Sequence, residues 1–250
     1  MNGNTTFQFD QTTGDLILPI NTLLNSQTIK QLHEIHEIQV PGLKPDQFTA
    51  WQVPYRYQKL KAIGTGAYAI VCEAYDVLLK KKVAIKKMNT PFRDNLYSIR
   101  SLRELILLKN MNHENVVNLF YCWTNSTSAE SFDSFYVVMP LVGRDLSQVM
   151  KYNLLADEHV QYIAYQTLKG LKYIHSAGIV HRDLKPSNIA VDAQVDAKIL
   201  DFGLARDDVS ENHIGMTGYV VTRYKAFSIF ENSWTTVKLL KILKIEEKWF

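Results

Sequence analysis

Two short stretches of sequence decide the fold: His181-Arg182-Asp183-Leu184-Lys185-Pro186-Ser187-Asn188 and Asp201-Phe202-Gly203. The first stretch follows residues 157–176, whose apolar side chains recur at the spacing of a helix with one apolar face. Residues 189–191 and 198–200, which lie between the two stretches, favour short strands. The chain therefore changes from helix to short strands at the place where these polar residues stand.

A glycine turn lies far upstream, between β-rich residues 57–62 and 70–76. It reads Ile63-Gly64-Thr65-Gly66-Ala67-Tyr68-Ala69-Ile70-Val71. Glycines let backbone N–H groups approach phosphate oxygens without a Cβ in the way. Ala69 stands at the third glycine position of G-x-G-x-x-G, and no helix follows directly, which argues against a dinucleotide-binding fold. Taken alone, the pattern also fits an ordinary glycine hairpin.

Lys86 ends the segment Val83-Ala84-Ile85-Lys86 in the next predicted strand, over residues 82–88. A lysine that points inward from a strand is costly to bury without a partner. Glu104, in a helix predicted over residues 96–111, is well placed to pair with it. Such a pair holds the lysine against the α- and β-phosphates of a nucleotide. As a single signal, Lys86 would be read as an ordinary surface lysine.

The composition is that of a globular chain able to build a sizeable core, with 46% hydrophobic and 21% charged residues among 250. A net charge of +3 without a dense Lys/Arg block predicts no nucleic-acid partner. No apolar run approaches the roughly 20 residues of a membrane helix, so we expect no membrane partner. Cys72 and Cys122 lie far apart without a CxxC spacing, which predicts neither a disulfide framework nor a zinc site.

The decisive stretches resemble the H-R-D-x-x-x-x-N and D-F-G signatures of protein kinases, in the same order. Residues 57–223 are similar to the MAP kinase family nearly throughout. Met216-Thr217-Gly218-Tyr219-Val220 resembles the Thr-Gly-Tyr activation lip of its stress-activated class. The resemblance implies an α+β, two-lobed protein-kinase fold, with a complete N-lobe of antiparallel sheet plus one helix and an incomplete helical C-lobe.

The resemblance implies that the chain is organised in four parts. We expect a partly disordered N-terminal extension over residues 1–51 and the N-lobe with its hinge over 52–143. A partial C-lobe with the catalytic loop and lip would cover 144–225, and a divergent tail 226–250.

Catalytic roles are implied by the same resemblance. Asp183 would accept the proton of the substrate hydroxyl, and Lys185 would neutralise charge on the transferring phosphoryl group. Asn188 and Asp201 would hold Mg²⁺, so the implied cofactors are ATP and Mg²⁺. Thr222 matches a residue that bridges to the catalytic Asp and Lys.

The implied nucleotide pocket combines the glycine turn with Ala84, Lys86, Glu104 and a hinge. Met139 holds the gatekeeper position, where the stress-activated class often has a small residue, and should close the pocket behind the adenine. Pro140 and Val142 would offer backbone groups to the adenine edge, and Asp145 would reach the ribose.

Regulation is implied at the lip, where an upstream MAP kinase kinase would phosphorylate Thr217 and Tyr219. A phosphate on Thr217 needs a cluster of guanidinium groups. The arginines in matching places are Arg100, Arg182 and Arg206, with Arg223 for the phosphate on Tyr219. We expect a monomer that phosphorylates Ser and Thr of protein substrates. Its expected location is the cytoplasm and, in addition, the nucleus.

The resemblance fades after Arg223, since Phe227 and Ser228 stand where relatives carry Pro and Glu. We expect the helix at 157–176 to lose packing partners and the chain to show little phosphotransfer. Two hypotheses follow. The first is a MAP-kinase-like protein Ser/Thr kinase that transfers the γ-phosphate of ATP in stress-activated signalling. The alternative is a truncated, catalytically weak or inactive isoform that binds nucleotide or partner proteins.

Overall fold

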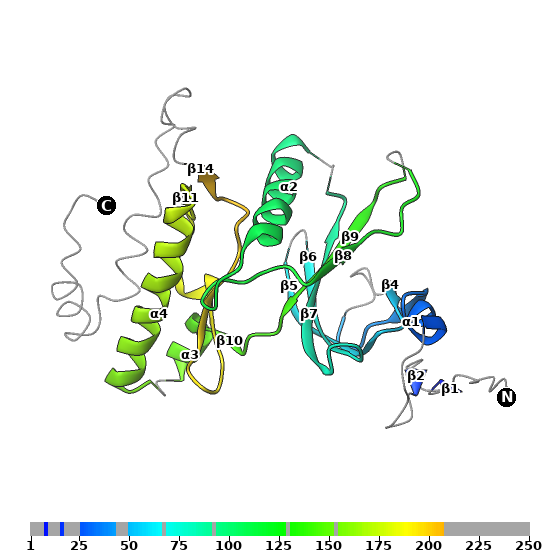
Figure 1. Ribbon diagram of the computed structural model, residues 1–250, viewed down its shortest axis with the longest axis horizontal. Coiled ribbons are helices and arrows are strands. Elements are labelled where there is room, and N and C mark those ends of the chain that lie inside the picture. The colour runs from blue at the N-terminus through cyan, green and yellow to red at the C-terminus, as the bar shows by residue number, and fades with distance from the viewer. Residues whose placement is uncertain are drawn as a thin grey trace. The chain divides into compact units, whose positions relative to one another are not determined.

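A computed structural model gives the structure of the chain (Figure 1). It describes residues 8–9, 16–17, 26–43, 50–66, 69–91, 94–128, 131–152 and 155–207. The chain divides into two compact units. Unit one consists of residues 1–92 and 120–141, and unit two consists of residues 93–119 and 142–250. Both strands and helices are present, as the predicted α+β class requires. Over the described ranges, no helix has the length and apolarity to cross a bilayer.

Unit one is built on a five-stranded antiparallel sheet in the order β5-β6-β7-β9-β8. Its strands are β5 (Tyr57–Thr65), β6 (Ala69–Asp76), β7 (Lys81–Asn89), β8 (Tyr121–Trp123) and β9 (Ser134–Pro140). Four of them confirm the strands that the sequence predicts at 57–62, 70–76, 82–88 and 135–140, and β8 was not predicted. Successive residues of β6 alternate between buried and half-buried, because neighbouring side chains of a strand point to opposite faces.

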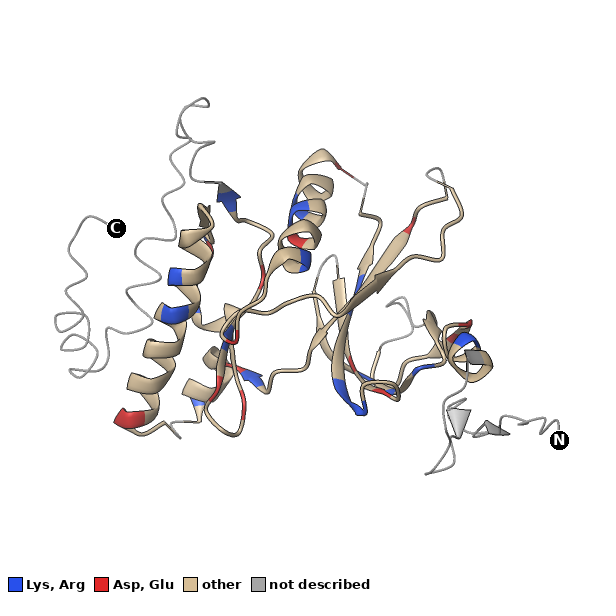
Figure 2. Ribbon diagram, in the orientation of Figure 1, with Lys and Arg blue, Asp and Glu red and all other residues tan. Residues whose placement is uncertain are grey.

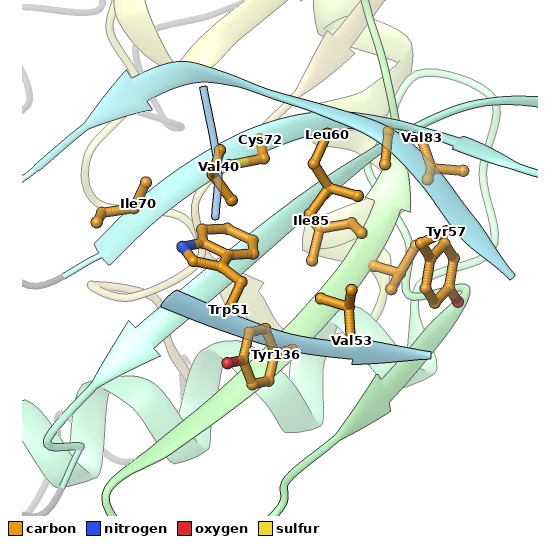
Figure 3. Packing of buried hydrophobic residues seen from close by; sticks show 12 residues of the cluster. Val40, Trp51, Val53, Tyr57, Leu60, Ile70, Cys72, Val83, Ile85 and Tyr136 are labelled. Atoms are coloured by element: carbon orange, nitrogen blue, oxygen red, sulfur yellow. The ribbon is translucent and has the colours of Figure 1, made fainter. Parts of the chain in front are cut away.

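The buried face of this sheet is covered by the N-terminal part of unit one. This part contains helix α1 (Ser26–Leu32) and an antiparallel pair, β3 (Ile35–Gln39) with β4 (Ala50–Pro54). A further short pair joins β1 (Gln8–Phe9) and β2 (Leu16–Ile17). Trp51 and Val53 are fully buried in the cluster drawn in Figure 3, with the Trp51 ring edge-on to Tyr136 at 5.7 Å.

Two buried cations, Lys87 and Arg56, bind oxygen atoms of neighbouring segments in unit one. The Lys87 ammonium donates to the Ala50 carbonyl over 3.0 Å, and burial lowers the pKa of Lys87. The Arg56 guanidinium donates from Nη2 to Asp76 Oδ2 over 2.6 Å, and both side chains are nearly or fully buried. Each cation therefore has an oxygen partner, without which its burial would be costly.

The described residues of unit two form four helices, one of them a 3₁₀ turn, and five short strands. The helices are α2 (Asn95–Asn110), α3 (Leu146–Lys151), α4 (Asp157–Ser176) and the 3₁₀ turn η1 (Pro186–Asn188). The strands are β10 (Arg144–Asp145), β11 (Ile179–Val180), β12 (Ile189–Val191), β13 (Ala197–Ile199) and β14 (Arg206–Asp207). Strands β10, β12 and β13 form one antiparallel sheet, and β11 pairs with β14. The helices predicted near 96–111 and at 157–176 are confirmed.

A buried polar network fixes α4 to β13. Asn115 donates to Gln166 Oε1 over 2.9 Å and to the Ala197 carbonyl over 3.1 Å. Gln166 in turn donates to the Val195 carbonyl over 2.9 Å. Gly170 lets the helix approach closely, since a Cβ there would lie 2.9 Å from the Asn115 carbonyl oxygen. The strands beside the loop at 181–188 therefore rest on α4.

We predict that Gly143→Ala destabilises unit two. A Cβ at Gly143 would collide with the Val191 carbonyl oxygen and lie 2.8 Å from Asp192 Cα, both backbone atoms that cannot rotate away. Overpacking of this kind costs about 1–3 kcal/mol. Urea denaturation of the full chain measures the effect.

Gly64→Ala is the matched control, because its Cβ would make only an ordinary contact of 3.8 Å with Val71. Equal unfolding midpoints for the two variants would contradict the packing seen at Gly143.

Candidate active site

Four predicted nucleotide-binding residues share one face of the sheet in unit one. Lys86 lies directly opposite Val71 on β6, and Ala84 lies opposite Met139 on β9. Residues directly opposite each other on antiparallel strands point to the same face. Their chain neighbour Ile85 belongs to the Trp51 cluster on the other face. The structure thus brings Val71, Ala84, Lys86 and Met139 together, away from the core that β4 closes.

The glycine turn joins β5 to β6, as predicted. Gly66 donates its N–H to the Ala69 carbonyl over 2.8 Å and closes the turn. Ile63, Gly64, Thr65 and Gly66 are exposed, while Ala67 and Tyr68 lie outside the described residues. Among the described residues a Cβ at Gly64 meets only Val71, at 3.8 Å, so packing in that part of the chain does not explain why this position is glycine.

The segment after β9 differs from expectation in one detail. The Asp145 carboxylate caps α3 by accepting from Gln148 N over 3.0 Å and from the Ser147 hydroxyl. That carboxylate therefore has a structural role, and its contact with a ribose stays a prediction. Pro140 ends β9 and has no backbone N–H, so it can offer an adenine edge only its carbonyl. The role of Val142 also stays a prediction.

Glu104 lies on the buried side of α2, with 7% of its surface exposed. Lys86 belongs to unit one and Glu104 to unit two. Their pairing stays a prediction.

Three side chains of the decisive stretch meet in unit two. The Lys185 ammonium donates to Asp183 Oδ2 over 2.7 Å. Asn188 Nδ2 donates to the same oxygen over 2.9 Å and to the Asp183 backbone carbonyl over 2.8 Å. Two of these bonds fix Oδ2 of the Asp183 carboxylate, and the third fixes its backbone. Oδ1 is thus the carboxylate atom left to accept a proton among the described residues.

His181 contacts this cluster through the backbone of Asp183 and is 2% exposed. Its Nδ1 accepts the Asp183 N–H over 3.3 Å, while Nε2 lies 2.8 Å from the Leu200 carbonyl. Only the neutral tautomer with hydrogen on Nε2 satisfies both contacts. Burial lowers the pKa of His181, which keeps the ring neutral. Phe202, fully buried, packs edge-on against it at 5.2 Å.

Two non-glycine residues of the site have left-handed backbone. Arg182 has φ 67° and Asp201 has φ 62°. Such residues cost of order 1–3 kcal/mol and persist only where the surroundings hold them. Here β11, which precedes Arg182, pairs with β14, which follows Asp201, so the chain is held at both ends. In addition, Gly203 N donates to Asp201 Oδ1 over 3.1 Å. Strained backbone therefore sits beside Asp183 and at the predicted metal ligand.

The residues predicted to hold Mg²⁺ have the right donor chemistry. Both hydrogens of Asn188 Nδ2 are used toward Asp183, so its Oδ1 is the atom that can ligate a cation. The Leu200 N–H donates to the Asn188 carbonyl over 2.8 Å, which ties Asn188 to the residue before Asp201. Among the described residues, no group of three or more His, Cys, Asp or Glu could hold a metal. Mg²⁺ fits such a site because it usually takes one or two carboxylates, waters and substrate phosphates.

The predicted phosphate-receiving residues are only partly described. Arg206 lies in β14 directly opposite Val180. Val180 is two residues before Arg182 in the chain. Arg100 is exposed on α2. Thr217, Tyr219, Thr222, Arg223 and the tail at 226–250 lie outside the described residues.

The positioning roles of His181 and Phe202 were missed from the sequence. Both residues stand inside the quoted motifs, so the signal was present, but neither carries chemistry that would mark a positioning role. Arg103 was also missed; its Nη1 donates to the Gly203 carbonyl over 3.4 Å.

Comparison with known proteins identifies the family of the chain. The protein kinase domain model matches residues 57–232. Mitogen-activated protein kinase 12 of Danio rerio is 54% identical over 176 residues, which cover 70% of this chain and 47% of that protein. Its namesake in Mus musculus is 51% identical over 185 residues, covering 74% and 49%. Mitogen-activated protein kinase 14 of Xenopus laevis is 50% identical over 185 residues, covering 74% and 50%.

The chain belongs to the protein kinase family. Within that family, its similarity to mitogen-activated protein kinases 12 and 14 confirms the resemblance to the MAP kinases drawn from the sequence. The chain spans about half the length of these relatives. The domain match extends to residue 232, somewhat beyond Arg223, where the resemblance was expected to fade.

We predict that His181 makes the chain less stable in acid. The folded pKa is lowered from its ordinary value of 6.5, so the unfolded chain takes up this proton first as the pH falls. Stability from neutral His181 is fully present above pH 6.5 and is lost below it, by at most about 1.4 kcal/mol per pH unit. Urea denaturation from pH 7.5 to 5 measures this slope.

In His181→Asn, which does not titrate, the slope below pH 6.5 should flatten. His33→Asn is the control, because His33 is exposed on the C-terminal side of α1. An unchanged slope in His181→Asn would show that other groups cause the acid loss.

Proposed function

We propose that this chain forms the nucleotide-binding and catalytic part of a MAP-kinase-type protein Ser/Thr kinase that transfers the γ-phosphate of ATP to Ser or Thr hydroxyls. The observation that carries the proposal is the arrangement at Asp183, whose Oδ2 is fixed by Lys185 and Asn188 while Oδ1 is left to take a proton. Membership of the protein kinase family supports it.

The proposed step needs little covalent chemistry from the protein. Asp183 Oδ1 takes the proton of a substrate hydroxyl as the hydroxyl oxygen bonds to the γ-phosphorus. The bond from that phosphorus to the β–γ bridging oxygen breaks, and ADP leaves with this oxygen. Lys185, which already donates to Asp183, places a positive charge where the transferring group gains negative charge.

ATP would contact the exposed glycine turn and the face that carries Val71, Ala84, Lys86 and Met139. Packing among the described residues does not require a glycine at position 64. This supports the proposal, since phosphates approach backbone N–H groups most closely at glycine. Mg²⁺, held by Asn188 Oδ1 and Asp201, would supply charge neutralisation on the phosphates.

The proposal extends to regulation. Thr217 and Tyr219 would be phosphorylated by an upstream MAP kinase kinase in stress-activated signalling, with Arg100, Arg182, Arg206 and Arg223 receiving the phosphates. The names of the similar kinases and the Thr-Gly-Tyr sequence support this part. Protein substrates, a monomeric state, and a cytoplasmic and nuclear location belong to the same proposal.

The test incubates the full chain, with and without an active MAP kinase kinase, with γ-labelled ATP, Mg²⁺ and a mixed library of Ser/Thr peptides. We expect label on Ser and Thr that is weak, in keeping with the little phosphotransfer expected from the sequence. Asp183→Asn should lower it further, by up to about 10²–10⁴-fold, because a positioned general base contributes that much. Asp196→Asn is the matched control, since Asp196 is exposed in the same unit.

Thermal-shift titration with Mg-ATP runs in parallel on each variant. Asp183→Asn should keep the wild-type shift, so that its lost turnover reports chemistry rather than binding. Equal labelling by Asp183→Asn and wild type would overturn the catalytic assignment. An Mg-ATP shift in the wild type without any labelling would favour the alternative, a nucleotide-binding protein without turnover.

A further inference from the structure

The turn that joins β6 to β7 has an apolar tip. It covers residues 77–80, and its first three residues are Val77, Leu78 and Leu79. Turns of hairpins usually carry Gly, Pro, Asn, Asp or Ser, which suit their backbone and face water. Here Leu79 exposes 44% of its surface instead. We call these three apolar residues the hairpin tip.

Three exposed lysines, Lys80, Lys81 and Lys82, follow the tip directly. Figure 2 shows basic residues at this end of the hairpin. Lys80 has φ 52°, in the left-handed region that glycine adopts most readily. A lysine therefore stands where the backbone alone favours glycine. We call these three lysines the lysine rim.

The acids of β6 leave this end of the sheet with a net positive charge. Glu73 pairs with Lys82 over 2.6 Å and neutralises one lysine of the rim. Asp76 is fully buried, and its charge is met by Arg56. On the neighbouring strand β5, Lys61 lies opposite Glu73 and is exposed. The surface around the tip is therefore complementary to negative charge.

The backbone N–H groups of the tip are already hydrogen-bonded within the chain. Asp76 Oδ1 accepts the Leu78 N–H over 2.9 Å and the Leu79 N–H over 3.1 Å. The Arg56 carbonyl accepts the Val77 N–H over 3.0 Å. The Arg56 guanidinium also holds the Asp76 carboxylate in place. The tip can therefore leave water without exposing an unpaired N–H group, which an apolar phase would penalise.

An apolar tip beside a basic rim matches the surface of a bilayer. Acyl chains begin just below anionic headgroups there, so the tip and the rim would both meet complementary groups. A nucleic acid offers phosphates to the lysines but no apolar phase to Leu79. The combination therefore favours a lipid surface over a soluble polyanion.

We propose that the hairpin tip inserts into the surface of a bilayer that contains anionic lipids, with the lysine rim at the headgroups. Lysine stems can lie along apolar surface while the ammonium groups stay in water. The contact needs no helix that spans a membrane. The expectation of no membrane partner rested on spanning runs and would be corrected for surface contact. The proposal concerns binding alone and does not depend on phosphotransfer by this chain.

The test measures how much of the full chain sediments with sucrose-loaded vesicles of phosphatidylcholine, alone or mixed with phosphatidylserine. We expect reversible binding to the mixed vesicles and none to phosphatidylcholine alone, because each lysine near an anionic surface strengthens binding about fivefold. Added salt should release the chain, since it screens exposed charges.

Two variants separate the rim from the tip. Lys80→Gly removes one charge and suits the left-handed backbone, so it should keep the fold and weaken binding about fivefold. Leu79→Gln should weaken binding at least about threefold, because less apolar surface leaves water. Thermal unfolding confirms that each variant is folded.

Met150 and Lys151 provide matched controls, as an exposed apolar residue followed by an exposed lysine at the end of α3. Met150 is 40% exposed, close to the value for Leu79. Met150→Gln and Lys151→Gln should leave vesicle binding unchanged, because this pair lies on a helix in unit two and not at the hairpin tip.

Insertion itself is tested with Leu79→Trp and mixed vesicles whose acyl chains carry bromine, which quenches indole fluorescence on contact. We expect the added fluorescence of Leu79→Trp to be quenched on these vesicles and not on unbrominated ones. Met150→Trp is the control and should show no added quenching.

Four outcomes would overturn the proposal. The chain does not bind the mixed vesicles, or Leu79→Gln binds them as tightly as wild type, which would reduce the contact to surface charge. Bound Leu79→Trp shows no quenching by brominated acyl chains. Alternatively, a DNA duplex binds with an affinity that falls in Lys80→Gly while the vesicles do not bind, which would assign the rim to nucleic acid.

Discussion

Asn188 holds Asp183 at two atoms, and the rest of the candidate active site depends on that attachment. The Nδ2 group donates to the carboxylate and to the backbone carbonyl of the same residue, so it fixes both the side chain and the loop. The Asn188 backbone accepts from Leu200 N and donates to the Lys185 carbonyl. One residue in a single 3₁₀ turn thus connects the loop at 181–188 to the residue before Asp201. Strained backbone at Arg182 and Asp201 can persist because these bonds oppose its relaxation.

In unit one the constraint is the two-sided character of the sheet. Lys86 and Lys87 are neighbours in β7, yet their side chains point to opposite faces. Lys87 is closed in beneath Trp51 and Tyr136 and donates to Ala50, so it fixes β4 to the sheet. Lys86 faces away from that cluster, with Val71 opposite. The N-terminal residues 26–43 and 50–54 therefore complete the core on one side of the sheet, and the predicted nucleotide-binding residues lie on the other side.

Much of this could be predicted from sequence, for physical reasons. Long strands with alternating burial, such as β6, and the helix at 157–176 have strong periodic signals. The motif residues Asp183, Lys185 and Asn188 are close in sequence, so local loop geometry is enough to bring their side chains into contact. Strand β8 has only three residues and no pattern of its own. It forms because Trp123 stacks on Tyr136 and Tyr57, a contact between distant segments that the sequence does not show.

Helix α2 shows a second limit. The spacing of Ile99, Leu102 and Ile106 predicts a helix correctly, but periodicity does not say which side is buried. The buried residues of α2 are Leu108 together with the polar Ser101 and Glu104, so hydrophobic spacing alone does not identify the buried side. Asp145 shows the same limit, since its carboxylate is used as a helix cap and sequence alone could not separate that role from a ribose contact.

A double-mutant cycle on unfolding tests the central attachment most directly. Asp183→Ala, Asn188→Ala and the double variant are each unfolded in urea, and the coupling free energy is taken from the four stabilities. Hydrogen bonds to a charged group contribute about 1.5–3 kcal/mol, so we predict a coupling of at least about 1 kcal/mol. Additive effects within about 0.5 kcal/mol, the range expected of independent sites, would show that Asn188 does not hold Asp183.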